Sequence, residues 1–241
     1  MVDVRVFDDS ASLGRFAAEQ VLEAIAARPD AVIGLATGSS PLSIYNAWAE
    51  LARERELNLS GVRCFALDEY AGIDPDHQES YRTVITNTVV GPVGLTPEQV
   101  HVPATVASAA AAAAYEEAIA AAGGVDLQIL GIGRNGHLGF NEPGSPFDSR
   151  TRRVSLTPET ISDNARFFGA PENVPGEAIT QGLGTIMDAR KLIIVAIGEA
   201  KAKAVAAAIA GPVTEQVPAS IVQRHPDVVY VLDRAAASLL P

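Results

Sequence analysis

Short apolar runs alternate along the chain with longer segments whose apolar residues recur at helical spacing. The apolar runs predict strands at residues 2–7, 31–36, 62–67, 125–130, 191–197 and 228–232. The segments between them predict helices at 13–25, 41–55, 79–90, 107–122 and 200–210. Because the strands are apolar throughout and alternate with helices, we expect an α/β fold with a mostly parallel sheet covered on both faces.

Residues 144–190 depart from this alternation, because they are rich in proline, glycine and polar residues and show no clear strand. In α/β domains such a segment often covers the carboxyl ends of the strands, where ligands bind. A long surface excursion is the alternative. No repeat of fixed period and no linker rich in proline or serine divides the chain. We therefore expect one domain over residues 1–241.

Composition and charge limit the possible partners. The chain has 18 Lys and Arg against 29 Asp and Glu, and its net charge of -11 disfavours nucleic acids and anionic membranes. An anionic small substrate still fits where a few cations and helix N-termini make a local positive site. No long apolar run or signal peptide is seen, and the single cysteine, Cys64, lies in an apolar run. We expect a cytoplasmic protein with a buried thiol.

Four predicted strands end in polar clusters, and parallel strands present these ends to one edge of the sheet. The clusters are TGSSP (37–41), DEY (68–70), GIGRNGHLGFNEPG (131–144) and GEAKAKA (198–204). In the first of them, hydroxyls and backbone amides before a helix either bind an anion or only cap the helix. Its residues are Thr37, Gly38, Ser39 and Ser40.

Two of the clusters contain groups that can move protons. Asp68 and Glu69 are adjacent in an extended segment and point to opposite sides, which leaves one carboxylate for the crevice. A carboxylate in a partly dry site gains proton affinity and can act as a base. The alternative is structural, because an aspartate at the end of a strand more often caps a helix or forms part of a turn. His137, with Glu142 and Asn135 beside it, suits an acid–base pair that opens a sugar ring. A structural histidine is the alternative.

Arg166 and Lys201 are the candidate cations for an anionic ligand. Lys201 lies near the N-terminus of the predicted helix at 200–210, where a positive side chain is unfavourable unless an anion lies between, and an ordinary solvated lysine is the alternative. GIGRNG formally matches a dinucleotide-binding pattern, but no acidic residue follows about 20 residues later and no P-loop occurs. No second His or Cys stands at ligand spacing from His137, which disfavours a metal site.

Together, LATGSSP, FALDEY, GIGRNGHLGFNEPG, SDNARFF and GEAKA resemble the motifs of the glucosamine-6-phosphate deaminase family, in the same order and over nearly the whole chain. The resemblance implies a three-layer α/β/α Rossmann-like domain, a fold shared with 6-phosphogluconolactonases. It also implies conversion of glucosamine 6-phosphate and water into fructose 6-phosphate and ammonia, with no metal or organic cofactor. Such an enzyme is an aldose–ketose isomerase and deaminase of amino-sugar phosphates, and by class we expect a hydrolase.

The resemblance also assigns roles to residues. Asp68 would take the C2 proton of the open-chain sugar and return it to C1, and His137 would open the ring with support from Glu142 and residue 135. The phosphate would be held by Thr37, Gly38, Ser39, Ser40, Arg166 and Lys201. The segment around 150–180 would act as a lid. The family's best-known branch has aspartate in place of Asn135, and asparagine cannot hold His137 by charge, so we expect the Glu142 contact to matter more.

Several alternatives fit parts of the pattern. 6-Phosphogluconolactonases typically read DER and DGHxASLFP, where this chain has DEY and NGHLGFNEP. A galactosamine-6-phosphate enzyme fits the same residues, and a non-catalytic sugar-phosphate sensing domain would carry a helix-turn-helix where this chain has its first strand. The activator site of the family's hexameric branch is matched by Ser145 and Arg152 but not by Pro146 and Val154, so we expect no activation by N-acetylglucosamine 6-phosphate. A monomer and a homo-oligomer both fit.

Overall fold

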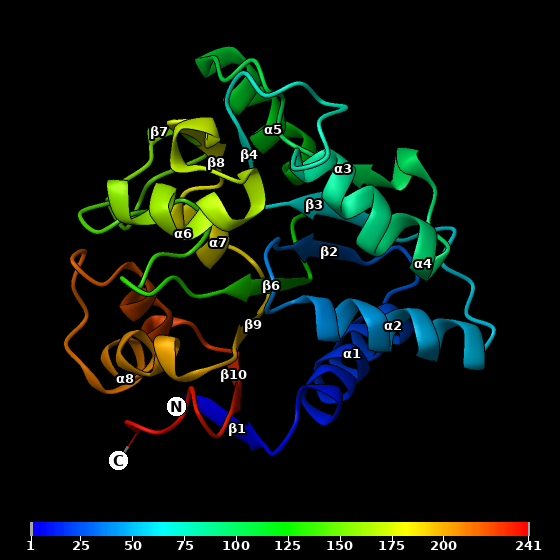
Figure 1. Ribbon diagram of the computed structural model, residues 1–241. Helices are drawn as coiled ribbons and strands as arrows, with labels where there is room; N and C mark the ends of the chain where they lie inside the picture. The colour runs from blue at the N-terminus through cyan, green and yellow to red at the C-terminus, as the bar shows by residue number, and fades with distance from the viewer. Residues whose placement is uncertain (1, 241) are drawn as a thin grey trace.

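The computed structural model describes residues 2–240, and its main feature is a seven-stranded sheet in which every neighbouring pair is parallel. Figure 1 shows the strands following one another from β3 near the top to β1 near the bottom. In spatial order they are β1 (Asp3–Phe7), β10 (Val228–Asp233), β9 (Lys191–Ala196), β6 (Leu127–Gly131), β2 (Val32–Leu35), β3 (Arg63–Ala66) and β5 (Val100–His101). All six predicted strands are confirmed, and the two-residue edge strand β5 was missed because it has no apolar run of its own.

Helices cover both faces of this sheet. Strands β1, β2, β3 and β5 succeed one another in one direction, and the chain then returns to β6, β9 and β10 on the other side of β2. Since crossovers between parallel strands are right-handed, the two halves place their helices on opposite faces. The α-helices are α1 (Ser10–Ala27), α2 (Leu42–Glu54), α3 (Tyr81–Ile85), α4 (Gly91–Val93), α5 (Ala109–Ala121), α6 (Pro158–Phe168), α7 (Leu183–Met187) and α8 (Ala202–Ala210). The predicted three-layer α/β/α arrangement is confirmed.

The predicted helix at 79–90 is broken rather than continuous. Its first part is α3, and the chain continues as the π-helix η1 (Thr86–Val90) before α4. The remaining short turns are 3₁₀-helices: η2 (Pro97–Gln99), η3 (Pro171–Asn173), η4 (Glu199–Lys201) and η5 (Pro218–Arg224). Thr residues at 83, 86 and 88 lie in or beside the π segment, and β-branched residues fit a regular α-helix poorly.

The core is made by the apolar strands and the inner faces of the helices. All residues of β2 are buried, as are five of the six in β9, and α1 contributes Leu13, Val21 and Ile25. Cys64 is fully buried, as predicted, and burial raises the pKa of its thiol. Gly34 is required where it stands, because a Cβ there would lie 2.0 Å from the buried Gln128 side chain.

The expectation that residues 144–190 contain no strand is wrong. This segment holds β7 (Arg152–Ser155) and β8 (Glu177–Thr180), with α6 between them and α7 after them. With β4 (Asp68–Tyr70), β7 and β8 form a second sheet, which is antiparallel. β7 and β8 are only four residues long, and neither contains a continuous apolar run that sequence inspection could detect.

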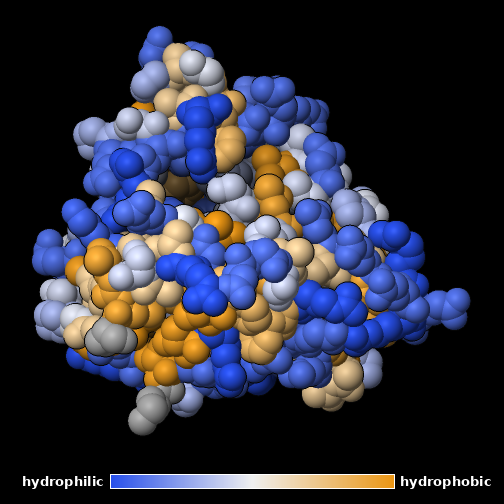
Figure 2. All heavy atoms as spheres, turned by 60° about the horizontal axis from the view of Figure 1, so that its bottom comes forward, coloured by the Kyte–Doolittle hydropathy of each residue, from blue (hydrophilic) through white to orange (hydrophobic). Residues whose placement is uncertain are grey.

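The surface is largely polar. Figure 2 shows hydrophilic residues around the margins of one face, a hollow in its upper half and hydrophobic residues gathered at the lower left. Large hydrophobic side chains that are exposed in the described part of the chain are few: Val6, Leu42, Val106, Phe167 and Leu239. Within residues 2–240, no helix combines the length and apolar character needed to span a bilayer.

Candidate active site

The candidate site lies where the strand order reverses. The chain leaves β2 toward β3 and later returns to β6 on the other side of β2, so the carboxyl ends of β2 and β6 form a topological switch point. Ligands of open parallel sheets bind at such a point. Residues 37–40 follow β2 and residues 132–144 follow β6, while β3 and β9 are the next neighbours on either side. The four polar clusters therefore stand at adjacent strand ends, as expected.

The side chains of Asp68 and Glu69 lie in different surroundings. The Glu69 carboxylate accepts hydrogen bonds from the backbone N–H groups of Tyr70, Tyr81 and Arg82 at 2.8–3.0 Å, so it caps α3. Asp68 is 5% exposed, and within residues 2–240 no hydrogen bond reaches its side chain. Burial raises the pKa of Asp68 well above its usual range, and the charge of Glu69 adds to the effect. Asp68 is therefore the carboxylate of the pair that is free to accept a proton.

Asp68 is separated from the loop after β6 by one glycine. Asp68 pairs with Thr180 across β4 and β8, and Gly139 lies against both residues. A Cβ on Gly139 would lie 2.8 Å from Thr180 Oγ1 and 3.3 Å from Asp68 Oδ2, and Gly139 has φ of +57°. A side chain at this position would fill the space beside the Asp68 carboxylate.

His137 and Glu142 form a pair on the same loop. The His137 Nδ1 lies 3.6 Å from Glu142 Oε2, and this buried nitrogen has no hydrogen-bond partner among the described residues. The imidazole lies over Gly133, because a Cβ on that glycine would be 2.3 Å from the ring carbon Cε1. The Gly133 N–H also donates to the His137 carbonyl at 3.0 Å, which closes the loop around the histidine.

Asn135 acts on this pair indirectly. Its Nδ2 donates to Glu142 Oε2 at 2.8 Å, and its Oδ1 accepts from the His137 backbone N–H at 3.2 Å. The side chain thus bridges Glu142 and the His137 backbone. Glu142 is the carboxylate beside the imidazole, and the expectation that this contact matters more when residue 135 is asparagine stays a prediction.

Glu142 is surrounded by donors. Burial opposes its ionisation, but the nearby His137 imidazole and the hydrogen bonds from Thr160 and Asn135 outweigh burial and lower the pKa of Glu142 to about 2. Glu142 is therefore a carboxylate over the whole neutral range and can hold the neighbouring imidazole in one orientation.

One candidate cation, Arg166, approaches the loop after β2, and the other, Lys201, lies near Arg166. Arg166 Nη2 lies 3.5 Å from Ser39 Oγ, although the two residues are far apart in sequence. Lys201 ends η4 and immediately precedes α8. Burial lowers the pKa of the Lys201 amine; the nearby Asp163 opposes this, while the like charges of Arg166 and Arg134 contribute to it. These cations are thus close enough to repel one another, and an anion between them would relieve the repulsion.

The loop after β2 can present backbone amides. Gly38 has φ of +92° and nothing lies near the position of a Cβ, so the chain turns sharply between Thr37 and Ser39. Pro41 then precedes the first turn of α2. A helix N-terminus with two serine hydroxyls and nearby cations is a favourable site for an anion.

Sequence inspection missed residues of α6 that reach the site. Thr157 and Thr160 contact Glu142, and Asn164 donates to the Tyr70 hydroxyl at 2.9 Å. Tyr70 also lies 3.4 Å, oxygen to oxygen, from Tyr81. The Thr-Pro start of α6 is a recognisable N-cap signal, but nothing in the sequence shows which carboxylate that turn faces.

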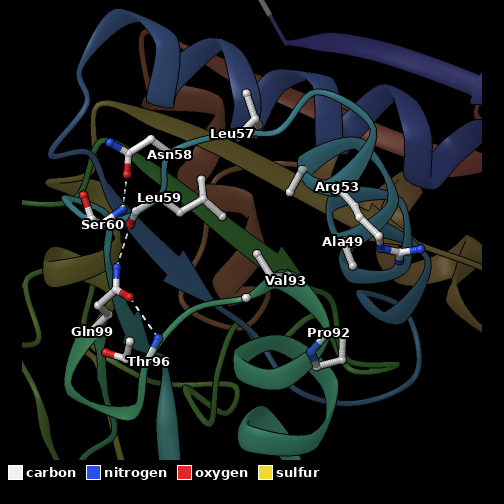
Figure 3. A pocket seen from close by; sticks show the side chains of 12 residues that line it. Ala49, Arg53, Leu57, Asn58, Leu59, Ser60, Pro92, Val93, Thr96 and Gln99 are labelled. Carbon is white, nitrogen blue, oxygen red and sulfur yellow. Dashed lines mark hydrogen bonds between the residues drawn. The ribbon is translucent and has the colours of Figure 1, made fainter.

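Two surface hollows lie away from these residues. Figure 3 shows the first, between the end of α2 and the segments that lead into β3 and β5, where Gln99 donates to the Leu59 carbonyl. It therefore lies at the amino ends of the strands, opposite the candidate site. The second lies beside the edge strand β5. Within residues 2–240, no three His, Cys, Asp or Glu side chains gather as a set that could hold a metal ion.

The fold and the site define an α/β protein with a buried carboxylate and a histidine–glutamate pair at the switch point of a parallel sheet. The family model "Glucosamine-6-phosphate isomerases/6-phosphogluconolactonase" matches residues 8–230, and the chain belongs to this family.

The family name covers isomerases and lactonases, and this chain is more similar to the deaminases given below than to the lactonase. The chain is 48% identical over 241 residues to a glucosamine-6-phosphate deaminase of Cutibacterium acnes, covering 99% of this chain and 92% of that protein. A solved structure of a monomeric glucosamine-6-phosphate deaminase superposes with a TM-score of 0.95 at 36% identity, covering 98% of this chain and 99% of the other. A 6-phosphogluconolactonase from Trypanosoma cruzi gives 0.79 at 23% identity, covering 100% and 97%, and at that identity the likeness concerns the fold alone.

Proposed function

We propose that this protein converts glucosamine 6-phosphate and water into fructose 6-phosphate and ammonia. The observation that carries the proposal is the placement of two proton-transfer groups around Gly139: the buried Asp68 carboxylate on one side and the His137–Glu142 pair two to three residues away along the loop. The deaminases of Cutibacterium acnes and of the monomeric solved structure support this substrate.

Ring opening is assigned to His137. The pyranose opens when O1 loses a proton and the ring oxygen gains one, and a single imidazole can carry out both transfers. Glu142 lies beside Nδ1, which leaves Nε2 for the sugar. Asn135 forms hydrogen bonds with both Glu142 and the His137 backbone, and so fixes their relative positions. The product of this step is the open-chain aldehyde with its amine on C2.

Isomerisation is assigned to Asp68. Its raised pKa gives a carboxylate that accepts the C2 proton, which the neighbouring aldehyde already acidifies. Loss of this proton gives an enolamine, and its return to C1 gives a C2 imine. Water then adds to the imine, and the C–N bond breaks to give the ketone and ammonia.

The phosphate is assigned to the turn after β2 with two cations. Thr37, Gly38, Ser39 and Ser40 would donate from backbone and hydroxyl groups, while Arg166 and Lys201 supply charge. The segment around 150–180, which includes β7 and α6, would be the lid of a single domain over residues 1–241. Arg166 near Ser39 supports this placement, because a lid residue and the phosphate turn already lie together.

The expected assignment to the hydrolase class is not supported by the comparisons. The more similar relatives described above are named deaminases, and the name of the matched family includes isomerases. In the mechanism above, the C2-to-C1 proton transfer is an isomerase step, and water enters only when the imine is opened.

Two substrates distinguish this proposal from its rival. The protein is incubated separately with glucosamine 6-phosphate, with ammonia measured, and with 6-phosphogluconolactone, with acid release measured. We expect ammonia from the first and no acceleration of the second above its spontaneous hydrolysis. The opposite pattern would favour a lactonase, and binding without either turnover would favour a sensing domain. Galactosamine 6-phosphate, measured in the same assay, tests the configuration at C4.

A further inference from the structure

One oxygen of the Glu142 carboxylate is held by the helix of the proposed lid. Glu142 Oε1 accepts hydrogen bonds from the Thr160 hydroxyl at 2.5 Å and the Thr157 hydroxyl at 3.2 Å. Thr157 is the N-cap of α6, and Thr160 lies in the first turn of that helix. The other oxygen, Oε2, faces Asn135 and His137. The two oxygens therefore have separate tasks.

Of the two threonines, Thr160 is the better placed to control the carboxylate. Thr160 is 3% exposed and Glu142 is 8% exposed, so their contact is shielded from water. Thr157 already uses its hydroxyl to accept from the Thr160 backbone N–H, as a helix cap does. A hydrogen bond from a buried hydroxyl to an ionised carboxylate is among the stronger kinds in proteins.

Few charges compete with this contact. In the described part of the chain, His137 is the titratable group whose charge acts on Glu142. The other donors to the carboxylate, on α6 and on the loop after β6, are neutral: Thr157, Thr160 and Asn135. Removing one neutral donor therefore changes how the carboxylate is held without adding or removing a charge.

We propose that Thr160 is a positioning residue for ring opening: its hydroxyl fixes Oε1 of Glu142 so that Oε2 stays directed at His137. The inference rests on the proposed deaminase function. Because α6 also carries Arg166, the helix that approaches the phosphate turn is the one that sets the ring-opening carboxylate. Docking of α6 thus completes both parts of the site together.

The test compares Thr160→Val, which keeps the shape and removes the donor, with Thr160→Ser, which keeps the donor. For the valine variant we expect kcat to fall by about tenfold to a hundredfold, and the acid limb of the pH profile to move up by about one pH unit. Inhibition by inorganic phosphate should change by less than about twofold, because the phosphate residues are untouched. The serine variant should stay within about threefold of the wild type. Ser162→Ala, on the exposed side of α6, is the matched control.

Each other outcome has a defined meaning. A valine variant with the wild-type kcat and pH profile would overturn the role of Thr160, and so would a serine variant as impaired as the valine one. Should the valine variant fail to fold, judged by circular dichroism, Thr160→Ala replaces it in the same comparison with serine. Absence of ammonia release from the wild type would count against the proposed function instead, and it is seen before any variant is made.

Discussion

Asn135 and Glu142 are joined by a hydrogen bond of 2.8 Å from the amide Nδ2 to the carboxylate Oε2, the same oxygen that faces His137. The asparagine also accepts from the His137 backbone N–H. One neutral side chain thus fixes both members of the acid–base pair from one side. This explains how a chain without aspartate at residue 135 can still orient its histidine.

Replacing Asn135 by alanine should therefore weaken ring opening without preventing the binding of phosphate. A lost hydrogen bond to a charged group corresponds to a decrease in kcat of roughly tenfold or more. Steady-state kinetics with glucosamine 6-phosphate checks this, with Asn58→Ala on the remote exposed loop as control. An unchanged kcat in Asn135→Ala would mean that Glu142 and His137 hold their geometry unaided.

The ionised Glu142 should also stabilise the fold in a pH-dependent way. Its pKa in the folded protein is about 2, below the roughly 4.3 of an unfolded chain, so the stabilisation is complete above that unfolded value. It is lost as the pH falls from about 4.5 toward 2, and amounts to roughly 2–3 kcal/mol. Urea unfolding of the wild type and Glu142→Gln across this range measures it. The stability difference between them should shrink on acidification, and a constant difference would contradict the assignment.

Lys201 should contribute mainly to binding. If it holds the phosphate equally in the ground and transition states, Lys201→Ala raises KM, and the inhibition constant of inorganic phosphate, by about tenfold or more with little change in kcat. Lys203→Ala, two residues on and exposed, is the matched control and should behave as wild type. A fall in kcat at constant KM in Lys201→Ala would place this lysine in the chemistry instead.

The proposed enzyme should show no activation by N-acetylglucosamine 6-phosphate. Arg152 donates to Asn141 Oδ1 and Ser145 Oγ, while Pro146 and Val154 offer no side-chain donor for a second phosphate. Rate against substrate concentration should be hyperbolic with or without the compound. A sigmoidal curve that becomes hyperbolic on its addition would contradict this prediction.

The inner strands of the main sheet could be predicted because they are buried on both sides. Runs such as 192–197 are apolar at every position, which is the signal that sequence inspection detects best. β7 and β8 are short and lack a continuous apolar run, so their pairing with β4 depends on contacts that no local pattern encodes. The main sheet, which positions the site, could thus be predicted from the sequence better than the segment with β7 and β8.

The residues of the candidate site also divide into those that could be predicted from the sequence and those that could not. Asp68, His137 and Glu142 could be found because they stand at strand ends, and the topology of a parallel sheet brings strand ends together. Thr160 could not, since it reaches Glu142 only through the packing of α6 against the loop after β6. The task of Asn135 was equally invisible, because an asparagine beside a histidine does not show which of the two oxygens of a nearby carboxylate it binds.

The central claim is tested most directly by measuring ammonia and fructose 6-phosphate released from glucosamine 6-phosphate by the wild type and by Asp68→Asn. We expect the wild type to form the two products in equal amounts. The asparagine variant should bind the substrate and form neither, because its side chain cannot accept the C2 proton. A wild type that releases no ammonia, or an Asp68→Asn variant that turns over at the wild-type rate, would contradict the account.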